Sequence, residues 1–345
     1  MSLVRFVGGC LSGVALLGLV TCTRPPVLQG ARLEALADVA SQVDGERLMG
    51  VVSDVIAAHR QDTLVDCSFL SEEERAHGAE QPFCHLTRQK AGALVQARFE
   101  QTGLRVRRQE TPGAPFATSN IIAELPGSTR PEEIVLVGAH YDAFYAGADD
   151  NTSGVAAVLE VARVLSGYRF ERTLRFVAFD FEEYGLVGSA DFVAAQKGVP
   201  ERLVAALVLD GMGYYDSAPG SQLSLPGLPT PSAGDFLAVI ANDTSSQRAS
   251  EIYALNEALK LMKVVPIIAP RDGTGPLTGN LMRSDHQPFW LQDHEAIHLT
   301  DTGDFRNPNY HRETDTIDTL EPTSFRQAVR LCAVTLAFWA GGPQP

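Results

Sequence analysis

From Asn120 onward, short apolar strands alternate with helical stretches, and this alternation restricts the fold more than any other feature of the sequence. Runs rich in β-branched and other apolar residues occur at 120–125, 133–140, 173–181, 202–210 and 296–300. Stretches with apolar residues at three- and four-residue steps, the helical period, occur at 151–165, 188–197 and 248–263. Continuous apolar strands separated by helices are typical of a mostly parallel sheet with helices on both faces. The sequence therefore predicts an α/β three-layer sandwich with a mostly parallel or mixed central sheet.

Further elements are predicted on either side of this pattern. Amphipathic helices are expected at 46–60 and 86–102, a helical stretch at 235–241 and a terminal helix at 322–339. A loop rich in proline, glycine and serine, 217–234, could separate two domains. Because strands and helices continue to alternate beyond that loop, we predict one catalytic domain over 41–345. It would consist of an N-terminal helical part, 41–119, and a core, 120–345.

The first 22 residues have the pattern of an export signal. Arg5 precedes an uncharged apolar run of about 15 residues, which suits a signal peptide because a membrane-spanning helix needs ~20. The run ends in LVTC, residues 19–22, which resembles a bacterial lipobox whose cysteine is lipidated. We therefore predict an exported protein, either a periplasmic or cell-envelope lipoprotein attached to the membrane through Cys22 or a secreted protein. Residues 23–40 would form a tether that leads into an early helix.

Charge and cysteine content narrow the choice of partners and compartment. The formal net charge is −14, which argues against a nucleic-acid partner because phosphate binding needs clustered lysine and arginine. In an oxidising compartment, Cys67 and Cys84 could form a disulfide across a short polar loop. Cys332 lies in an apolar helical pattern and is expected to be buried. No oligomeric state follows from the sequence.

Acidic and histidine residues follow the carboxyl ends of several predicted strands, where ligands gather in open α/β sheets. These residues are His140 and Asp142 after the strand at 133–140, Glu182 and Glu183 after 173–181, Asp210 at the end of 202–210, Asp301 and then His311 after 296–300, and Asp149 and Asp150 at the entrance of the helix at 151–165. Carboxylates and imidazoles from five segments are thus expected at one edge of the sheet.

Each of these residues also has a structural explanation when taken alone. Asp149 and Asp150 could cap the helix that follows them, and Asp210 could belong to a turn with Gly211. A histidine at a strand end is commonly held by a backbone partner. Other polar residues are expected to be structural or solvated, namely Asp180, Asp315, Asp318, His286, His294 and His298.

Taken together, the same residues predict a metal centre. Several carboxylates in one water-poor site raise one another's pKa, and a divalent ion removes this conflict. Two histidines with three or four carboxylates suit zinc. A carboxylate that bridges two ions ~3.5–4 Å apart would build a two-metal hydrolase centre, in which water becomes a nucleophile near neutral pH. Glu182 and Glu183 could then supply one general base and one metal ligand.

Five motifs of the chain, in their order and spacing, resemble those of the co-catalytic zinc aminopeptidases. This group, metallopeptidase family 28, also includes glutamate carboxypeptidases and glutaminyl cyclases. The motifs are HYDAFYAGADDNTSG, FDFEEYGLVGS, LVLDGMG, SDHQPFW and NPNYHRETDT. They cover the chain from about Asn120 to the C-terminus, whereas residues 24–119 match only loosely. The resemblance implies Zn²⁺ as cofactor, with two ions in a peptidase and one in a cyclase-like enzyme.

The resemblance also implies metal ligands at the matching positions. His140 would bind one zinc ion and Asp210 the other, which Asp210 shares with the second half of the ligand set, and Asp150 would bridge both ions. Glu183 would complete the coordination of one ion and His311 that of the other. All five positions carry the expected residue type.

Three further roles follow from the same motifs. Glu182 would be the general base, and Asp142 would orient His140 as carboxylates do behind zinc-binding histidines. Tyr310 would hydrogen-bond the developing oxyanion. The peptide bond between Asp150 and Asn151 would be cis, as it often is in the family.

The expected function is therefore that of an aminopeptidase acting on peptide substrates. Two alternatives share the site, a glutaminyl cyclase-type transferase with one zinc ion and a carboxypeptidase-type metallohydrolase. A binding protein that uses the fold without catalysis is a third alternative, and the intact Glu182 argues against it. Tyr310 stands where cyclases carry tryptophan, and the segment after the glutamate pair lacks their insertion. Both features favour the peptidase.

Overall fold

The protein has a central mixed sheet, seen in a computed structural model that describes residues 28–68, 71, 83–113, 116–224, 230–275 and 278–344. Among these residues, eight strands form the sheet in the order β2-β3-β6-β4-β7-β10-β8-β9. They are β2 (Arg105–Thr111), β3 (Thr118–Leu125), β4 (Arg130–His140), β6 (Arg172–Phe179), β7 (Arg202–Leu209), β8 (Leu237–Asn242), β9 (Val264–Ala269) and β10 (Ala296–Thr300). The central strands β6, β4, β7 and β10 are parallel, so their carboxyl ends meet at one edge.

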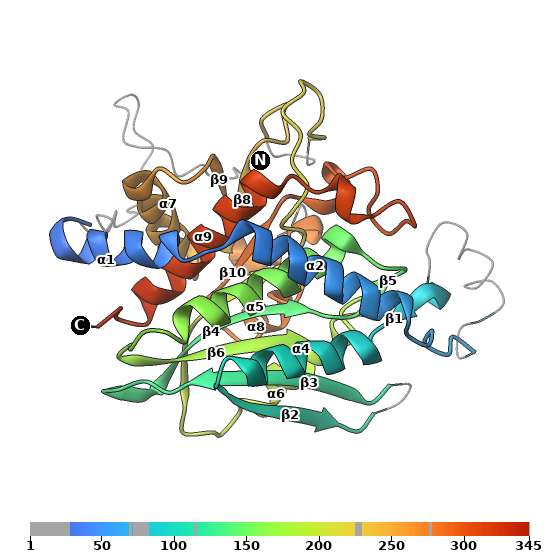
Figure 1. The fold of residues 1–345 in the computed structure, drawn as a ribbon, viewed down its shortest axis with the longest axis horizontal. Coiled ribbons are helices and arrows are strands. Elements are labelled where there is room, and N and C mark those ends of the chain that lie inside the picture. Colours follow the sequence, from blue (N-terminus) through green and yellow to red (C-terminus); the bar gives the residue numbers. More distant parts are fainter. Residues whose placement is uncertain are drawn as a thin grey trace.

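Helices cover both faces of this sheet, which confirms the three-layer architecture (Figure 1). One face packs against α1 (Gly30–Ser41), α2 (Gly45–Arg60), α4 (Gln89–Gln101), α5 (Gly154–Leu165), α7 (Ser246–Leu259) and α9 (Pro322–Trp339). The other face packs against α6 (Val187–Ala195) and the short α8 (Gln287–Trp290). The predicted terminal helix is confirmed. Glu321 caps α9 by accepting hydrogen bonds from the backbone N–H groups of Thr323 and Ser324, at 2.9 and 2.7 Å.

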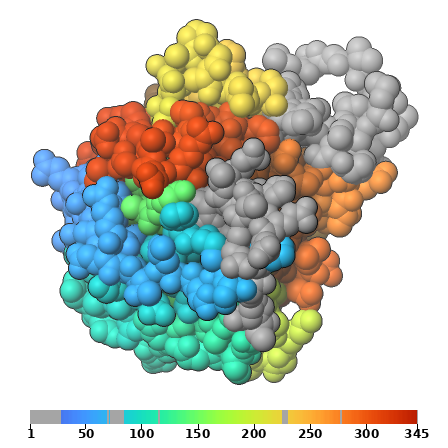
Figure 2. Space-filling view, turned by 90° about the vertical axis from the view of Figure 1, so that its right-hand side faces the viewer, coloured from blue at the N-terminus to red at the C-terminus, as the bar shows by residue number. Residues whose placement is uncertain are grey.

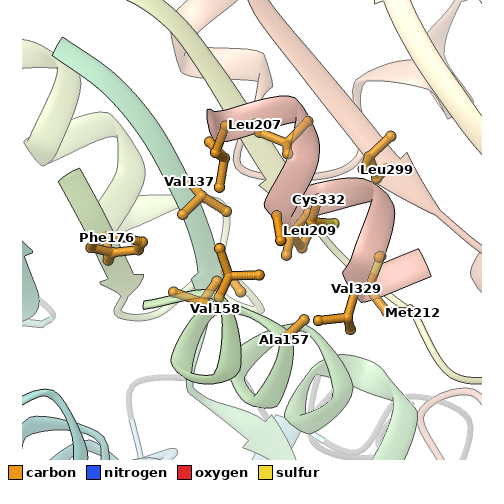
Figure 3. Close-up of a cluster of buried hydrophobic side chains, with 14 of the residues drawn as sticks. Val137, Ala157, Val158, Phe176, Leu207, Leu209, Met212, Leu299, Val329 and Cys332 are labelled. Atoms are coloured by element: carbon orange, nitrogen blue, oxygen red, sulfur yellow. The ribbon is translucent and has the colours of Figure 1, made fainter. Parts of the chain in front are cut away.

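Successive residues of the buried strands contact opposite helix layers, because side chains alternate along a strand. In β4, Val137 packs into the layer that contains α5 and α9, whereas Leu136 packs into the layer that contains α6 and α8. Figure 3 shows the first of these cores, which contains Leu207 and Leu209 of β7 and Val158 of α5. Both faces of the central strands are apolar for this reason.

The predicted helix at 235–241 is wrong, since Leu237–Asn242 forms β8. An apolar run of this length has no polar side, so periodicity alone does not distinguish a buried strand from a helix. Here β8 lies between β10 and β9, and its residues alternate between the two cores. The edge strand β9 has no counterpart in the prediction; it contains Pro266, a residue that sheets accept on edge strands.

A disulfide and a short sheet join the N-terminal region to the core. Cys67 and Cys84 are bonded, a pairing that the sequence left open, and free Cys332 is buried, as expected. Just beyond this bond, β1 (Leu86–Thr87) pairs antiparallel with β5 (Ala143–Phe144), so α4 begins at Gln89 and not at residue 86. Disulfides persist in oxidising compartments, so a disulfide is typical of proteins outside the cytoplasm.

We expect removal of this disulfide to lower the free energy of unfolding by ~3 kcal/mol, because the bond closes a loop of 17 residues in the unfolded chain. The change is Cys67→Ser together with Cys84→Ser, measured by urea denaturation against the wild type. Wild-type protein unfolded in reductant serves as the control and should show the same loss. An unchanged midpoint would contradict this prediction.

The predicted leader, with Cys22, lies outside the described residues, so lipid attachment stays a prediction. Within residues 23–40, the predicted tether, α1 begins at Gly30, and its Leu36 and Val39 are buried in the main core. No helix in the described part of the chain combines the length and apolar character needed to cross a membrane.

Candidate metal centre

The five residues predicted as metal ligands converge at the carboxyl edge of the sheet. His140 is the last residue of β4, Asp210 directly follows β7, and Glu183 follows β6 after a short turn. Asp150 lies in the turn Ala148–Ser153 that precedes α5, and His311 lies in the long loop after β10. Their ligand atoms form two groups that share Asp150, with all atoms of a group within 4.8 Å of one another.

The first group consists of His140, Asp150 and Asp210. Nε2 of His140 lies 3.4 Å from Oδ1 of Asp150 and 3.5 Å from Oδ1 of Asp210. On the other side of the ring, Nδ1 lies 3.0 Å from the carbonyl oxygen of Asp142. A proton on Nδ1 satisfies that carbonyl, and the lone pair of Nε2 then points at the two carboxylates. This is the tautomer that a metal-binding histidine needs.

The second group consists of Asp150, Glu183 and His311. Nε2 of His311 lies 3.0 Å from Oδ2 of Asp150 and 3.1 Å from Oε2 of Glu183. The two carboxylate oxygens of Asp150 are thus divided between the groups, Oδ1 toward His140 and Oδ2 toward His311. Each group therefore contains one oxygen of the same carboxylate. The cis peptide bond predicted between Asp150 and Asn151 is confirmed.

The expected distribution of ligands between the two ions is wrong. The resemblance separated His140 from Asp210 and Glu183 from His311, but each of these pairs lies in one group. The order of the strands is the cause, because β4 and β7 are neighbours and Gly138 pairs with Val208. His140 and Asp210, at the ends of these two strands, therefore lie side by side.

Asp142 connects the histidine side of the site to the glutamate pair. Its carboxylate accepts hydrogen bonds from the backbone N–H groups of Glu182 and Glu183, at 3.1 and 3.2 Å. The same carboxylate lies 3.4 Å from Nδ1 of His140. Phe181, directly before the pair, has a positive φ of 54°, and this sharp turn directs both glutamates into the site. One buried side chain thus orients residues from two strands.

The charges of the site are out of balance without a cation. Burial raises the pKa of Glu182 well above its usual value, and it raises that of Glu183 to about 7. Burial alone would lower the pKa of His311, but the Glu183 and Asp150 carboxylates outweigh it and raise the pKa to about 10. Raised pKa values of neighbouring carboxyl groups, together with a raised pKa of an adjacent imidazole, are expected where carboxylates lie close together in a site with little water.

The donor set fits zinc. Buried Nε2 of His140, Nε2 of His311 and Oε1 of Glu183 have no hydrogen-bond partner among the described residues. Buried polar atoms are rarely left without a partner, and imidazole nitrogens with carboxylate oxygens are ligands that zinc prefers. The two groups would hold one ion each, with Asp150 between them.

Glu182 and Tyr310 lie beside these groups. Glu182 is only 8% exposed, and its Oε2 lies 4.0 Å from Nε2 of His140, but it belongs to neither ligand group found among the described residues. The Tyr310 ring stacks on His311, with ring centroids 3.8 Å apart, and its hydroxyl accepts a 3.4 Å hydrogen bond from Arg283. Both side chains are placed to act on a substrate without occupying a ligand position.

A pocket opens next to the ligand groups. Asp150, Asp210 and Tyr310 line it together with apolar side chains from three different segments, Ile240, Leu281 and Phe305, and with several polar residues. The loop that begins after Asp210 projects from the body of the molecule; its described parts, 211–224 and 230–236, are yellow in Figures 1 and 2. A substrate that reached the metal ligands would contact this pocket.

The interpretation of Asp315 as a solvated or capping residue is wrong. Asp315 is only 2% exposed, and its carboxylate accepts hydrogen bonds from the backbone N–H groups of Asp149 and Asp150, at 3.0 to 3.1 Å. Those partners lie more than 160 residues away in the sequence, so no local pattern could have revealed the contact. Asp318, in the same loop, is exposed as expected.

Most other polar residues set aside in the sequence have structural surroundings. Asp180 accepts a hydrogen bond from the Ser119 backbone and pairs with Arg88. His286 and His298 stack with ring centroids 4.5 Å apart, and burial lowers the pKa of the two to about 4 and about 3. Both imidazoles are therefore neutral parts of the core at neutral pH.

Several known proteins are similar to this chain in sequence. The family described as Peptidase family M28 matches residues 120–336. Uncharacterized protein YfbL of Escherichia coli is 32% identical over 257 residues, which are 70% of this chain and 77% of that protein. Aminopeptidase YwaD of Bacillus subtilis is 36% identical over 115 residues, which are 32% of this chain and only 24% of that protein.

The solved structures give the same result at the level of the fold. The aminopeptidase from Aneurinibacillus sp. strain AM-1 superimposes with a TM-score of 0.64 at 17% identity, over 90% of this chain and 97% of that chain. Glutamate carboxypeptidase homologues and glutaminyl cyclases are also among the similar proteins. The match over residues 120–336 covers more than half of the chain and contains every residue of the two ligand groups. The chain therefore belongs to peptidase family M28, a family of zinc metallopeptidases.

Proposed function

We propose that this protein is a di-zinc aminopeptidase that removes N-terminal residues from peptides. One observation carries the proposal: Asp150 directs its two carboxylate oxygens to two separate ligand groups, each with its own histidine. Bound zinc ions would polarise the scissile carbonyl and lower the pKa of water so that it attacks near neutral pH. The similarity to aminopeptidases in sequence and fold supports the proposal.

The residues of the chain then have distinct tasks. Glu182, next to the ligand groups and buried, accepts a proton from the attacking water and transfers it to the leaving amine. The carboxylate of Asp142 fixes the position of Glu182 by accepting a hydrogen bond from the backbone N–H group of Glu182. The Tyr310 hydroxyl donates a hydrogen bond to the oxyanion that develops on the substrate carbonyl.

Among the described residues that line the pocket, no cationic side chain is free to bind a substrate carboxylate. Among the described residues that line it, Arg283 alone has a cationic side chain, and this side chain pairs with Asp304 at 3.0 and 3.2 Å. A carboxypeptidase needs a cation that is available for the substrate carboxylate, so this pocket suits aminopeptidase action better.

A panel of peptide substrates tests the function. We expect purified protein to release p-nitroaniline from aminoacyl-p-nitroanilides, to lose this activity in 1,10-phenanthroline and to regain it with added zinc. Peptides blocked at the N-terminus should resist cleavage, and peptides blocked at the C-terminus should be cleaved. Cleavage of only the N-blocked set would indicate a carboxypeptidase. Conversion of Gln-peptides to pyroglutamate, without release of amino acids, would indicate a cyclase.

A further inference from the structure

The same hydrogen-bond arrangement occurs twice in the site, once near each of the two histidines of the ligand groups. In the first half, Asp142 comes two residues after His140, and its carboxylate accepts the backbone N–H groups of the adjacent acids Glu182 and Glu183. In the second half, a second aspartate comes four residues after the other histidine and binds a second pair of adjacent acids in the same manner. That aspartate is Asp315, after His311, and its pair is Asp149 and Asp150.

The contacts of Asp315 join two segments that are distant in the chain. Its Oδ1 lies 3.0 Å and its Oδ2 lies 3.1 Å from the backbone nitrogen of Asp149, and Oδ2 lies 3.1 Å from that of Asp150. The carbonyl oxygen of Asp315 also accepts a hydrogen bond from the N–H group of Ala148, at 3.3 Å. Three successive N–H groups of the turn before α5 thus end on one residue of the His311 loop.

The local environment makes a carboxylate costly at this position. Asp315 is buried beside the carboxylates of Asp149 and Asp150, and its described hydrogen bonds come from backbone N–H groups, without a cation. Burying a charged group requires compensation. Here the compensating hydrogen bonds come from the backbone N–H groups of Asp149 and Asp150. Asp150 is the residue that both ligand groups share.

We propose that Asp315 is a positioning residue of the metal centre, which fixes Asp150 relative to His311 and so forms the ligand group Asp150–Glu183–His311. This inference rests on the proposed metal-dependent function. Asp315 would do for the second group what Asp142 does for the glutamate pair, although among the described residues its carboxylate bonds to backbone N–H groups and not to a ligand side chain.

The effect should be larger for one ion than for the other. His140 and Asp210 are held by the ends of neighbouring strands, where the backbone N–H group of Asp210 donates to the carbonyl of Leu299 at 3.1 Å. His311, in contrast, lies in an irregular loop with a positive φ of 58°. The position of His311 therefore depends on contacts such as those of Asp315, and the positions of His140 and Asp210 do not.

Zinc titration of Asp315→Asn tests the proposal. Asparagine keeps the shape of the side chain but lacks one of the two acceptor oxygens. We expect affinity for the ion of the His311 group to fall ~10–100-fold, the usual range for a partner behind the ligands. Affinity for the other ion should fall clearly less, because the His140 group shares only Asp150 with the segment that Asp315 holds. The matched control is Asp318→Asn, an exposed aspartate in the same loop, which should bind both ions like the wild type.

Two background variants identify the affected ion. In Asp210→Ala, which weakens the His140 group, Asp315→Asn should have its full effect on the remaining ion. In His311→Ala, which removes the second group, Asp315→Asn should have only its smaller effect on the remaining ion, because coupled residues are not additive. Wild-type affinity for both ions in Asp315→Asn, or equal losses at both, would overturn the proposal.

Hydrogen exchange in the metal-free wild type provides a test that needs no variant. The amides of Asp149 and Asp150 should exchange slowly if the Asp315 carboxylate accepts them before metal binds, and fast exchange would overturn the proposal. Because both readouts are independent of peptide hydrolysis, a failure of the aminopeptidase function would leave this test intact. A protein that binds two ions yet cleaves no peptide would refute only the function.

Discussion

Replacing Glu182 with glutamine is expected to lower peptide hydrolysis by ~10²–10⁴-fold, the range that general acid–base catalysis contributes, while zinc binding is unchanged. Glutamine has the shape of glutamate and keeps the backbone N–H group that donates to Asp142. It cannot accept the proton of the attacking water. Since Glu182 belongs to neither ligand group in the described part of the chain, its loss should leave both ions in place.

The measurement combines turnover of an aminoacyl-p-nitroanilide with metal analysis of the same sample. Glu313→Gln, at an exposed position two residues after His311, is the matched control and should retain wild-type turnover. Wild-type turnover in Glu182→Gln would remove Glu182 from the mechanism. Loss of zinc from that variant would instead identify Glu182 as a metal ligand.

Replacing Asp150 with alanine is expected to empty both metal positions and abolish activity. Asp150 contributes one oxygen to each ligand group, so its removal leaves His140 with Asp210 and Glu183 with His311, two protein ligands for each ion. Zinc sites in proteins normally use three or four protein ligands. Two ligands should hold zinc too weakly to survive gel filtration.

Asp210→Ala is the contrasting variant, because it removes a ligand from one group only. Metal analysis after gel filtration should find one ion per chain in Asp210→Ala and none in Asp150→Ala. Two retained ions in Asp150→Ala, or loss of both in Asp210→Ala, would contradict the bridging role. Apo and variant proteins should be compared by circular dichroism, so that unfolding is not mistaken for loss of metal.

Much of the fold could be predicted because apolar patterns report burial directly. The alternation of strands and helices predicted the three layers, and the period of residues 322–339 predicted α9 to the residue. The pattern was ambiguous where a segment is buried on all sides. For Leu237–Asn242, a helix and a strand would bury the apolar run equally well. The segment forms a strand because it pairs with the neighbouring strands β10 and β9.

For the site too, features that depend on nearby residues could be predicted, whereas features that depend on distant segments could not. His140, Asp210 and the glutamate pair could be placed at one edge because parallel strands end together, and this follows from strand positions in the sequence. Which of them lie in one group depends on the order of strands in the sheet, which puts β4 between β6 and β7. The sequence does not contain that order in any local pattern.

The sequence by itself determined the layers, the edge at which the acids and histidines meet, and the residue types that suit zinc. The tertiary structure alone decided the grouping of the ligands and the contacts of Asp315. The physical reason is that burial and periodicity act between near neighbours in the chain, whereas the hydrogen bonds of Asp315 join residues more than 160 positions apart. Contacts at that distance exist only once the sheet has formed.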